Sequence, residues 1–456
     1  MSSSSSNQDL RTYLRSLAAQ FPDDIITIKE RVTHGEVGAV VRELELHGRD
    51  EVLIFSNVEG IDGDLVTNLF ASRERIARLL KTHGSSLHSA FYAAAARTRA
   101  PRILKEGALF SVVQDGDNVD LSALPMIQHY DTDRGAYITS GILIAEDPDT
   151  RVGNMSYHRA TPHSRNELAT SLHSRGDLWR MLTRAAVRGM DLPIAMVIGG
   201  HPLLMLAAAA KAPADVDERA VAGGLFGKGL EVAATPVHGI LVPASAELVL
   251  EGSLLSDRNV DEGPFGEFTG YSSDRSTRNV IRVDRVLRRP NAILVDVCGG
   301  NSADHLNLSR IPREADMVSR LRQRFPEVVA VHYPTSGTHF HCYVAVDQRL
   351  PGGARQVIAA LLGWDPYLKL VVAVDSDVDV TNDRDVLWAL ATRFQPHRDV
   401  VIIDGLPGSL LDPSSTSDGR TSRMGLDATK GEDFRGMRLS ISEEPLVRAR
   451  QLLGYV

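Results

Sequence analysis

Apolar residues recur along the chain with two different periods, and changes of period divide it into parts. Residues 8–21 carry apolar side chains at helical spacing, whereas Ile25–Ile28 and Val52–Phe55 are short runs typical of strands. The next apolar stretches, up to residue 97, again have helical spacing. We therefore expect residues 1–107 to form an N-terminal α/β portion.

From residue 108 to about 302 the pattern is different. Short apolar runs, for example 136–139, 194–198 and 239–242, are separated by clusters of glycine, proline and aspartate. This spacing predicts a β-rich barrel or sandwich with helical insertions.

The pattern of residues 303–456 predicts a connector helix followed by a last α/β domain. Residues 303–325 have a helical apolar stripe, in which Pro312 is expected to produce a kink or to mark the true start. From 326 to 456, strand-like and helical stretches alternate. The fold class is therefore α/β (α+β).

Composition narrows the class of protein. The net charge of −8 and the pI of about 6.0 argue against a nucleic-acid-binding surface. The longest apolar run, 203–210, is far shorter than the roughly 20 residues of a membrane span. The first residues do not resemble a signal peptide, and the two cysteines, Cys298 and Cys342, form no CxxC pair. We expect a cytoplasmic protein.

Two acids in a glycine- and proline-containing stretch are the sharpest chemical feature. Glu262 and Glu267 flank Gly-Pro-Phe-Gly, a sequence that cannot form a regular helix. A shaped loop of this kind can hold two carboxyl groups near one point, which separates their pKa values into an acid and a base. The alternative is an ordinary solvated turn.

A second candidate region begins at residue 154. Arg159 could grip a carboxylate with two parallel hydrogen bonds. Asn154, His173 and Glu218 form an oxygen and nitrogen donor set suited to a manganese or magnesium ion (Mn²⁺ or Mg²⁺). Taken singly, each of these residues is more often structural.

Two further motifs are weaker. Residues 223–229 look like a phosphate loop but lack its first glycine and its final serine or threonine. His339 and His341 would share one strand face and could bind a metal ion, but no carboxylate is near them in the sequence, which favours a structural role.

Several ordered blocks together resemble the UbiD decarboxylase family from about residue 10 to the end. They are residues 242–252 followed by 262–267, residues 154–159, residues 369–393 and residues 411–429. The resemblance implies that 108–302 is a split β-barrel binding prenylated FMN. It also implies that 326–456 is an oligomerisation domain of a homodimer or homohexamer, with the active site in the cleft between the two.

The resemblance also implies site residues. The catalytic set falls on Arg159, Glu262 and Glu267, and the metal ligands fall on Asn154, His173 and Glu218. A potassium ion (K⁺) is expected near Met155 and the 207–210 backbone. Alanines stand at 208 and 209, where some relatives have serine. The implied cofactor-binding residues are Asn154, Met155, Ser156, Arg159, His173, Glu218 and Lys369.

The implied reaction is the reversible, non-oxidative decarboxylation of an aromatic, heteroaromatic or α,β-unsaturated acid through a covalent prenylated-FMN adduct. Arg159 is expected to hold the carboxylate and Glu267 to donate the replacing proton. A flavin prenyltransferase would supply the cofactor. Two alternatives remain open: an accessory subunit without turnover, which the intact Arg159, Glu262 and Glu267 disfavour, and a metal-dependent hydrolase built on Asn154, His173 and Glu218.

Overall fold

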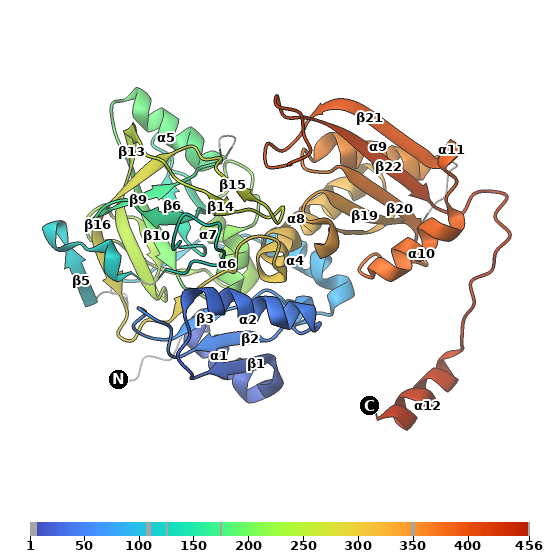
Figure 1. The fold of residues 1–456 in the computed structure, drawn as a ribbon, viewed down its shortest axis with the longest axis horizontal. Coiled ribbons are helices and arrows are strands. Elements are labelled where there is room, and N and C mark those ends of the chain that lie inside the picture. The colour runs from blue at the N-terminus through green and yellow to red at the C-terminus, as the bar shows by residue number, and fades with distance from the viewer. Residues whose placement is uncertain (1–6, 106–110, 125, 174–175, 348–351, 455–456) are drawn as a thin grey trace.

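The computed structural model describes residues 7–105, 111–124, 126–173, 176–347 and 352–454. Three bodies follow one another along the chain: an N-terminal portion, a central barrel and a C-terminal domain (Figure 1). The single long helix α8 (Ala303–Arg324) joins the barrel to the C-terminal domain. The expected boundary at 107/108 lies outside the described residues.

The N-terminal portion is a small α/β layer that borrows a strand from far along the chain. Its sheet has the order β1-β2-β3-β17, and β17 pairs parallel with β3. Helices and strands occur where the apolar spacing predicts them. The elements are α1 (Leu10–Gln20), β1 (Ile25–Ile28), α2 (His34–Leu46), β2 (Val52–Phe55), β3 (Leu65–Thr67), α3 (Arg73–Leu79), α4 (Leu87–Ala95) and β17 (Leu294–Val295).

The central body is a strongly curled antiparallel sheet, which confirms the predicted split barrel. Its strand order is β7-β6-β10-β13-β16-β9-β8, and β5 also pairs with β16. The strands are β5 (Ser111–Asp115), β6 (Ile142–Glu146), β7 (Gly153–Tyr157), β8 (Ala160–Pro162), β9 (Glu167–Thr170), β10 (Leu192–Ile198), β13 (Leu248–Asn259) and β16 (Asn279–Arg288).

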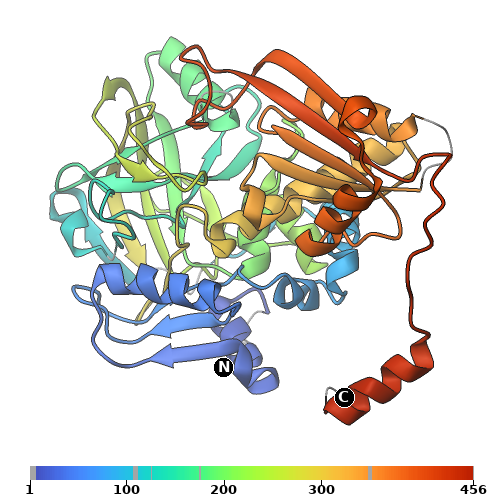
Figure 2. The same cartoon turned by 45° about the vertical axis from the view of Figure 1, so that its right-hand side comes forward.

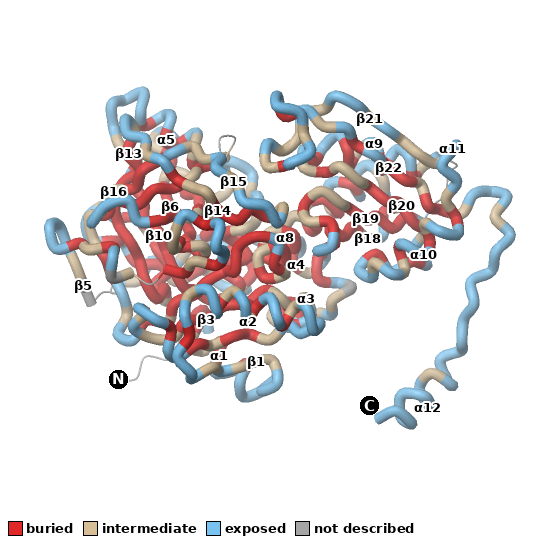
Figure 3. Tube along the Cα trace, viewed as in Figure 1, coloured by how far each residue is buried: buried red, intermediate tan, exposed pale blue. Residues whose placement is uncertain are grey.

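Both faces of this sheet are covered, which explains its continuous apolar runs. Along β10, Ala195 and Val197 pack into one core with α6 and α7, whereas Ile194 and Met196 pack into a second core with α5. Figure 3 shows this buried interior. The covering helices are α5 (Asp177–Val187), α6 (Pro202–Ala208) and α7 (Glu218–Phe226).

Two small sheets complete the barrel region. They are β12-β11-β4 and the hairpin β14-β15. The predicted strand at 136–139 is wrong, since Tyr137 and Ile138 form only isolated bridges to Ile127 and Ala160. The small-sheet strands are β4 (Arg102–Ile103), β11 (Glu231–Ala234), β12 (Leu241–Pro243), β14 (Phe265–Gly266) and β15 (Ser272–Ser273).

The C-terminal domain is a five-stranded sheet between helices, in the order β18-β19-β20-β22-β21. Helices α8 and α9 pack on one face and α10 on the other. Helix α8 runs through Pro312, so this proline does not mark its start. The other elements are β18 (Val328–His332), β19 (His341–Val346), α9 (Gly353–Trp364), β20 (Leu370–Asp375), α10 (Asp383–Arg393), α11 (Pro396–Asp399), β21 (Val400–Pro407) and β22 (Arg420–Ala428).

Beyond β22 the chain leaves the body as an arm that ends in α12 (Glu443–Leu453), and two views show this helix standing apart (Figures 1 and 2). No residue of α12 is buried. Within the described ranges, no helix has the length and apolarity that crossing a bilayer requires.

A buried carboxylate ties the N-terminal helix to the barrel. The Glu247 side chain has no exposed surface and accepts hydrogen bonds from Arg11 at 2.9 and 2.7 Å and from Arg289 at 3.1 Å. The backbone N–H of Ile293 also donates to it, at 3.1 Å. Ile293 immediately precedes β17, so this one carboxylate holds α1, the end of β16 and the start of the borrowed strand together.

We therefore expect Glu247→Gln to destabilise the protein by about 3 kcal/mol, because it leaves two cationic side chains without their buried partner. Thermal unfolding of the variant measures the loss. The matched control is Glu59→Gln, which breaks the exposed Arg31–Glu59 pair and should change stability by less than about 1 kcal/mol. Equal effects of the two substitutions would contradict the assignment.

Candidate active site

One guanidinium and two carboxylates from distant parts of the chain meet in the barrel. Arg159 lies between β7 and β8, and its Nε and Nη2 donate to Glu262 at 2.8 and 3.2 Å. Its Nη1 donates to Glu267 at 2.5 Å. The sequence-predicted catalytic residues are thus in direct contact, although more than a hundred positions separate Arg159 from either acid.

The two acids are held by the hairpin between β14 and β15. Gly263 has φ +100°, a conformation that residues with a Cβ rarely adopt, so the chain can turn between Glu262 and the hairpin. Glu267 follows β14, and its N–H donates to the carbonyl of Tyr271 at 3.0 Å across a tight turn. The Gly-Pro-Phe-Gly stretch is therefore a rigid spacer that points both carboxylates at Arg159.

Two contacts of this hairpin were not found from the sequence. The carboxylate of Asp133 accepts the N–H of Gly266 at 2.8 Å, which fixes the strand that precedes Glu267. The guanidinium of Arg159 lies 4.5 Å from the ring centroid of Phe265, a cation–π arrangement. Nothing in the local sequence around Asp133 distinguishes it from the acids of an ordinary turn.

Burial sets the electrostatics of the three groups. The Glu262 side chain has no exposed surface, and those of Arg159 and Glu267 are 13% and 11% exposed. Burial raises the pKa of Glu267, and the charge of Glu262 raises it further, whereas Arg159 acts in the opposite direction. For Arg159, burial lowers the pKa but the hydrogen bond to Glu262 and the charge of Glu267 outweigh it, so the net pKa is raised. The cluster thus combines a permanent cation with a carboxylic acid whose pKa is raised above the ordinary glutamate value.

A second polar cluster lies on β7, directly before Arg159. Asn154 and Ser156 alternate along the strand, and His158 directly follows its end. Hydrogen bonds link Ser156 to Asn154 at 3.1 Å and to His158 at 3.0 Å. Glu218, the first residue of α7, accepts the N–H of Met155 at 2.9 Å and the side-chain amide of Asn154 at 3.4 Å.

Two of the three predicted metal ligands are therefore together. His173 is exposed, and its Nε2 lies 3.4 Å from the hydroxyl of Tyr367 in the C-terminal domain. Its place beside Asn154 and Glu218 stays a prediction. In the part of the chain that the structure describes, no three His, Cys, Asp or Glu side chains group as metal ligands.

The chemistry of Glu218 nevertheless fits a cation. It is buried, and none of the described basic side chains forms an ion pair with it. Burial raises its pKa to about 7, although the N–H of Met155 works against this. A buried acid of this kind is stabilised when a cation binds beside it.

Lys369, expected near the cofactor phosphate, has other partners. Its Nζ lies 2.8 Å from Asp412 and 2.6 Å from the hydroxyl of Ser414, both in the C-terminal domain. Ala208 and Ala209 close α6, where only backbone groups could contribute to binding.

Phe268, next to Glu267, packs the β14–β15 hairpin against the C-terminal domain. Its ring centroid lies 4.5 Å from that of His339, 5.5 Å from Phe340 and 5.8 Å from Tyr367. The candidate site therefore lies where the barrel and the C-terminal domain meet, as expected for a cleft between them.

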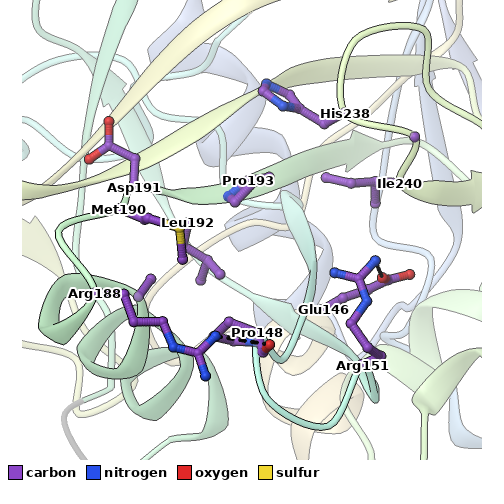
Figure 4. A pocket seen from close by; sticks show the side chains of 12 residues that line it. Glu146, Pro148, Arg151, Arg188, Met190, Asp191, Leu192, Pro193, His238 and Ile240 are labelled. Carbon is purple, nitrogen blue, oxygen red and sulfur yellow. Dashed lines mark hydrogen bonds and ion pairs between the residues drawn. The ribbon is translucent and has the colours of Figure 1, made fainter.

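A surface hollow of about 260 Å³ lies elsewhere, at the ends of β6 and α5 (Figure 4). It contains none of the predicted site residues. Its cations already have partners, since Arg151 pairs with Glu146 at 2.7 Å and Arg188 donates to the carbonyl of Pro148 at 3.2 Å. We assign no function to it.

Three family models cover most of the chain. They describe the N-terminal, Rift-related and C-terminal domains of 3-octaprenyl-4-hydroxybenzoate carboxy-lyase, and they match residues 20–94, 102–302 and 307–428. Among curated proteins, the chain is 35% identical over 384 residues to an anhydromevalonate phosphate decarboxylase of Aeropyrum pernix, covering 83% of this chain and 85% of the relative.

Solved structures agree. The UbiD-class enzyme HmfF of Pelotomaculum thermopropionicum in complex with FMN superposes with a TM-score of 0.90 at 32% identity, covering 98% of this chain and all of that one. An evolved dimeric form of HmfF, in complex with prFMN, has a TM-score of 0.87 at 30% identity and covers 99% of this chain and all of its own.

Vanillic acid decarboxylase of Sedimentibacter hydroxybenzoicus has been solved in a closed form, with a TM-score of 0.84 at 27% identity, and in an open form, with 0.86 at 26%. Each form covers 98% of this chain and 99% of its own. With matching models along all three bodies and close relatives over nearly its whole length, the chain belongs to the UbiD family and is a carboxy-lyase of that family.

Proposed function

We propose that this enzyme decarboxylates an α,β-unsaturated, aromatic or heteroaromatic acid with prenylated FMN as cofactor. One observation carries the proposal: the buried Arg159 contacts both Glu262 and Glu267 beside the interface with the C-terminal domain. This arrangement unites a carboxylate-binding cation with a proton donor in a water-poor site.

The cofactor assignment rests on the relatives and on the cluster at β7. HmfF carries FMN in one structure and prFMN in another. In this chain, Asn154 and Glu218, with His173, would hold a manganese or magnesium ion against the cofactor phosphate. Met155 and the 207–210 backbone would contact potassium, with Ser156 and Lys369 nearby. When bound, the prenylated flavin supplies the electron sink that no side chain offers.

Arg159 would position the substrate. It makes four hydrogen bonds, so one of the five N–H donors of a guanidinium remains. Protonation of Glu267 weakens its bond to Arg159, and a substrate carboxylate can then take over that donor. The cation thereby stays balanced by Glu262 while the substrate is held for loss of carbon dioxide.

Glu267 would then complete the reaction. As the bond to carbon dioxide breaks, the proton of Glu267 forms the new C–H bond at the same carbon. Glu262 would have a positioning role, because its two bonds to Arg159 orient the guanidinium, and its charge adds to burial in raising the pKa of Glu267. Read in reverse, the same groups would support carboxylation.

Glu267→Gln should reduce turnover by at least about a hundredfold, because the amide cannot deliver a proton. The experiment uses enzyme co-produced with a flavin prenyltransferase and follows carbon dioxide release and cofactor absorbance. Absorbance should stay as in the wild type. Asp261→Asn, an exposed acid of the same loop, is the matched control and should stay active. Robust turnover of Glu267→Gln, or a colourless active wild type, would overturn the proposal.

The pH profile offers a second test. Since the donor is the protonated form of Glu267, kcat should be flat at low pH and fall as pH rises through a pKa above the ordinary glutamate value. Glu262→Gln removes the neighbouring charge that raises this pKa and leaves Arg159 to lower it. The falling limb should therefore move to lower pH in the variant. An unmoved limb, or one displaced to higher pH, would refute the proposed coupling.

We also propose that the enzyme is a homo-oligomer in which the arm binds a second copy. Met437, Leu439 and Ile441 are 92%, 97% and 67% exposed, and they alternate with Arg438 and Ser440 along an extended segment. In an extended chain these three apolar side chains share one face. A neighbouring copy of the chain would bury that face.

Replacing Met437, Leu439 and Ile441 together by serine should shift the protein toward monomer in light scattering coupled to gel filtration. The arm makes no contribution to the buried cores, so the melting temperature of the monomer body should change little. A wild-type monomer, or a variant with unchanged assembly, would contradict this role.

A further inference from the structure

Basic side chains gather behind the catalytic hairpin, where α8 meets the loop before β19. Arg310 and Arg313 come from α8, and His339 comes from the loop. His339 packs against Phe268, which directly follows Glu267, and its Nε2 lies 3.4 Å from the hydroxyl of Ser309. The proposed reaction does not use these groups.

Arg310 is the unusual member of this cluster. It has no exposed surface, and its Nη2 donates to the backbone carbonyl of Thr338. Its Nε and Nη1 have no hydrogen-bond partner among the described residues, and no described carboxylate forms an ion pair with it. Burial lowers the pKa of Arg310 to about 9, which reflects how poorly its charge is compensated.

Two acids of this region already have other partners. Glu314, one turn further along α8, accepts hydrogen bonds from Arg73 and from the N–H of Tyr333. Asp365 pairs with Arg313 and accepts the hydroxyl of Tyr333 at 2.8 Å. Arg310 is therefore the surplus cation of the cluster.

Two more buried polar atoms beside Arg310 also have no hydrogen-bond partner in the described part of the chain. They are Oγ1 of Thr338 and Nδ1 of His339. Thr338 has φ +49°, a strained conformation for a β-branched residue, and such strain is typical of ligand-binding loops. A guanidinium, a hydroxyl and an imidazole, all buried and unsatisfied, thus belong to adjacent segments.

A buried cation with unsatisfied donors destabilises the folded protein unless an anion binds beside it and accepts those hydrogen bonds. The unsatisfied atoms are two guanidinium nitrogens, a hydroxyl oxygen and an imidazole nitrogen. Together they are more than the two oxygens of a carboxylate engage, and they suit the three oxygens of a phosphate monoester. This cluster is separate from Asn154 and Glu218, where the proposed function places the cofactor phosphate.

We propose that Arg310, Thr338 and His339 bind a phosphate group on the substrate, at the end distant from the carboxylate that Arg159 holds. The inference rests on the proposed function and narrows the substrate class to phosphorylated unsaturated acids. The Aeropyrum pernix relative is named for such an acid. Entry of the phosphate requires Phe268 to separate from His339, and vanillic acid decarboxylase is known in open and closed forms.

Binding can be measured without turnover. The cofactor-loaded enzyme is titrated with inorganic phosphate while its melting temperature is followed, so that the cofactor phosphate site is already filled. Arg310→Met should melt a few degrees higher than the wild type without phosphate, since a buried unpaired charge is removed, and should lose the phosphate-induced rise. Arg320→Met, on the exposed side of the same helix, should behave like the wild type.

Kinetics then identify the ligand. The paired substrates are anhydromevalonate phosphate and its unphosphorylated form, with a dicarboxylic acid of matching length as the third arm. Arg310→Met should reduce kcat/KM for the phosphorylated acid by about 30- to 100-fold and that for the unphosphorylated acid by less than about threefold.

Several outcomes would overturn the inference: equal losses for both acids, a wild-type preference for the dicarboxylic or unphosphorylated acid, or loss of flavin binding in Arg310→Met, which would assign Arg310 to the cofactor. A wild type that decarboxylates none of the acids contradicts the proposed function instead. In that case the phosphate titration still decides whether the anion site exists.

Discussion

The proposed active site depends on burying one guanidinium against two carboxylates. In a low-dielectric interior a lone arginine or a lone glutamate is costly, whereas Arg159, Glu262 and Glu267 compensate one another. The raised pKa of Glu267 would let this acid carry the proton that the proposed reaction needs. The pairing requires the connection between β7 and β8 to keep its position relative to the β14–β15 hairpin. Three features maintain that position: the turn at Gly263, the hydrogen bond from Gly266 to Asp133, and the curled sheet.

The buried charges of the molecule fall into two groups. Glu247 and Glu314 have their full complement of partners, and each joins segments far apart in the sequence. Glu218 and Arg310 are as deeply buried but lack a charged partner among the described residues. Such a charge costs stability, because an apolar side chain of similar size would be more stable there. The proposed ligands would offset that cost: a cation beside Glu218 and an anion beside Arg310.

Local pattern predicted much of the fold. Helices and strands with a clear period, such as α1, β10 and α9, form where their apolar spacing indicates. Pairings between distant segments could not be derived this way, so the borrowing of β17 by the N-terminal sheet is visible only in the structure. The convergence of Arg159 with Glu262 and Glu267 came from the family resemblance, because sequence spacing carries no information about contacts between remote loops. Nothing in the sequence distinguishes Arg310, because an arginine in a helical segment is usually a surface charge and only the structure shows that this one is buried.

Phe268 connects these features physically. It follows the proposed proton donor directly, and its ring packs against His339, Phe340 and Tyr367 of the other body. In the proposed mechanism, this contact would exclude water from the side of Glu267 that faces the C-terminal domain and so preserve the raised pKa on which proton donation would depend. The same contact positions His339 beside Arg310. A substrate that spans both charges would therefore stabilise the closed arrangement through its distant end, and the binding energy gained there would serve the chemistry at Glu267.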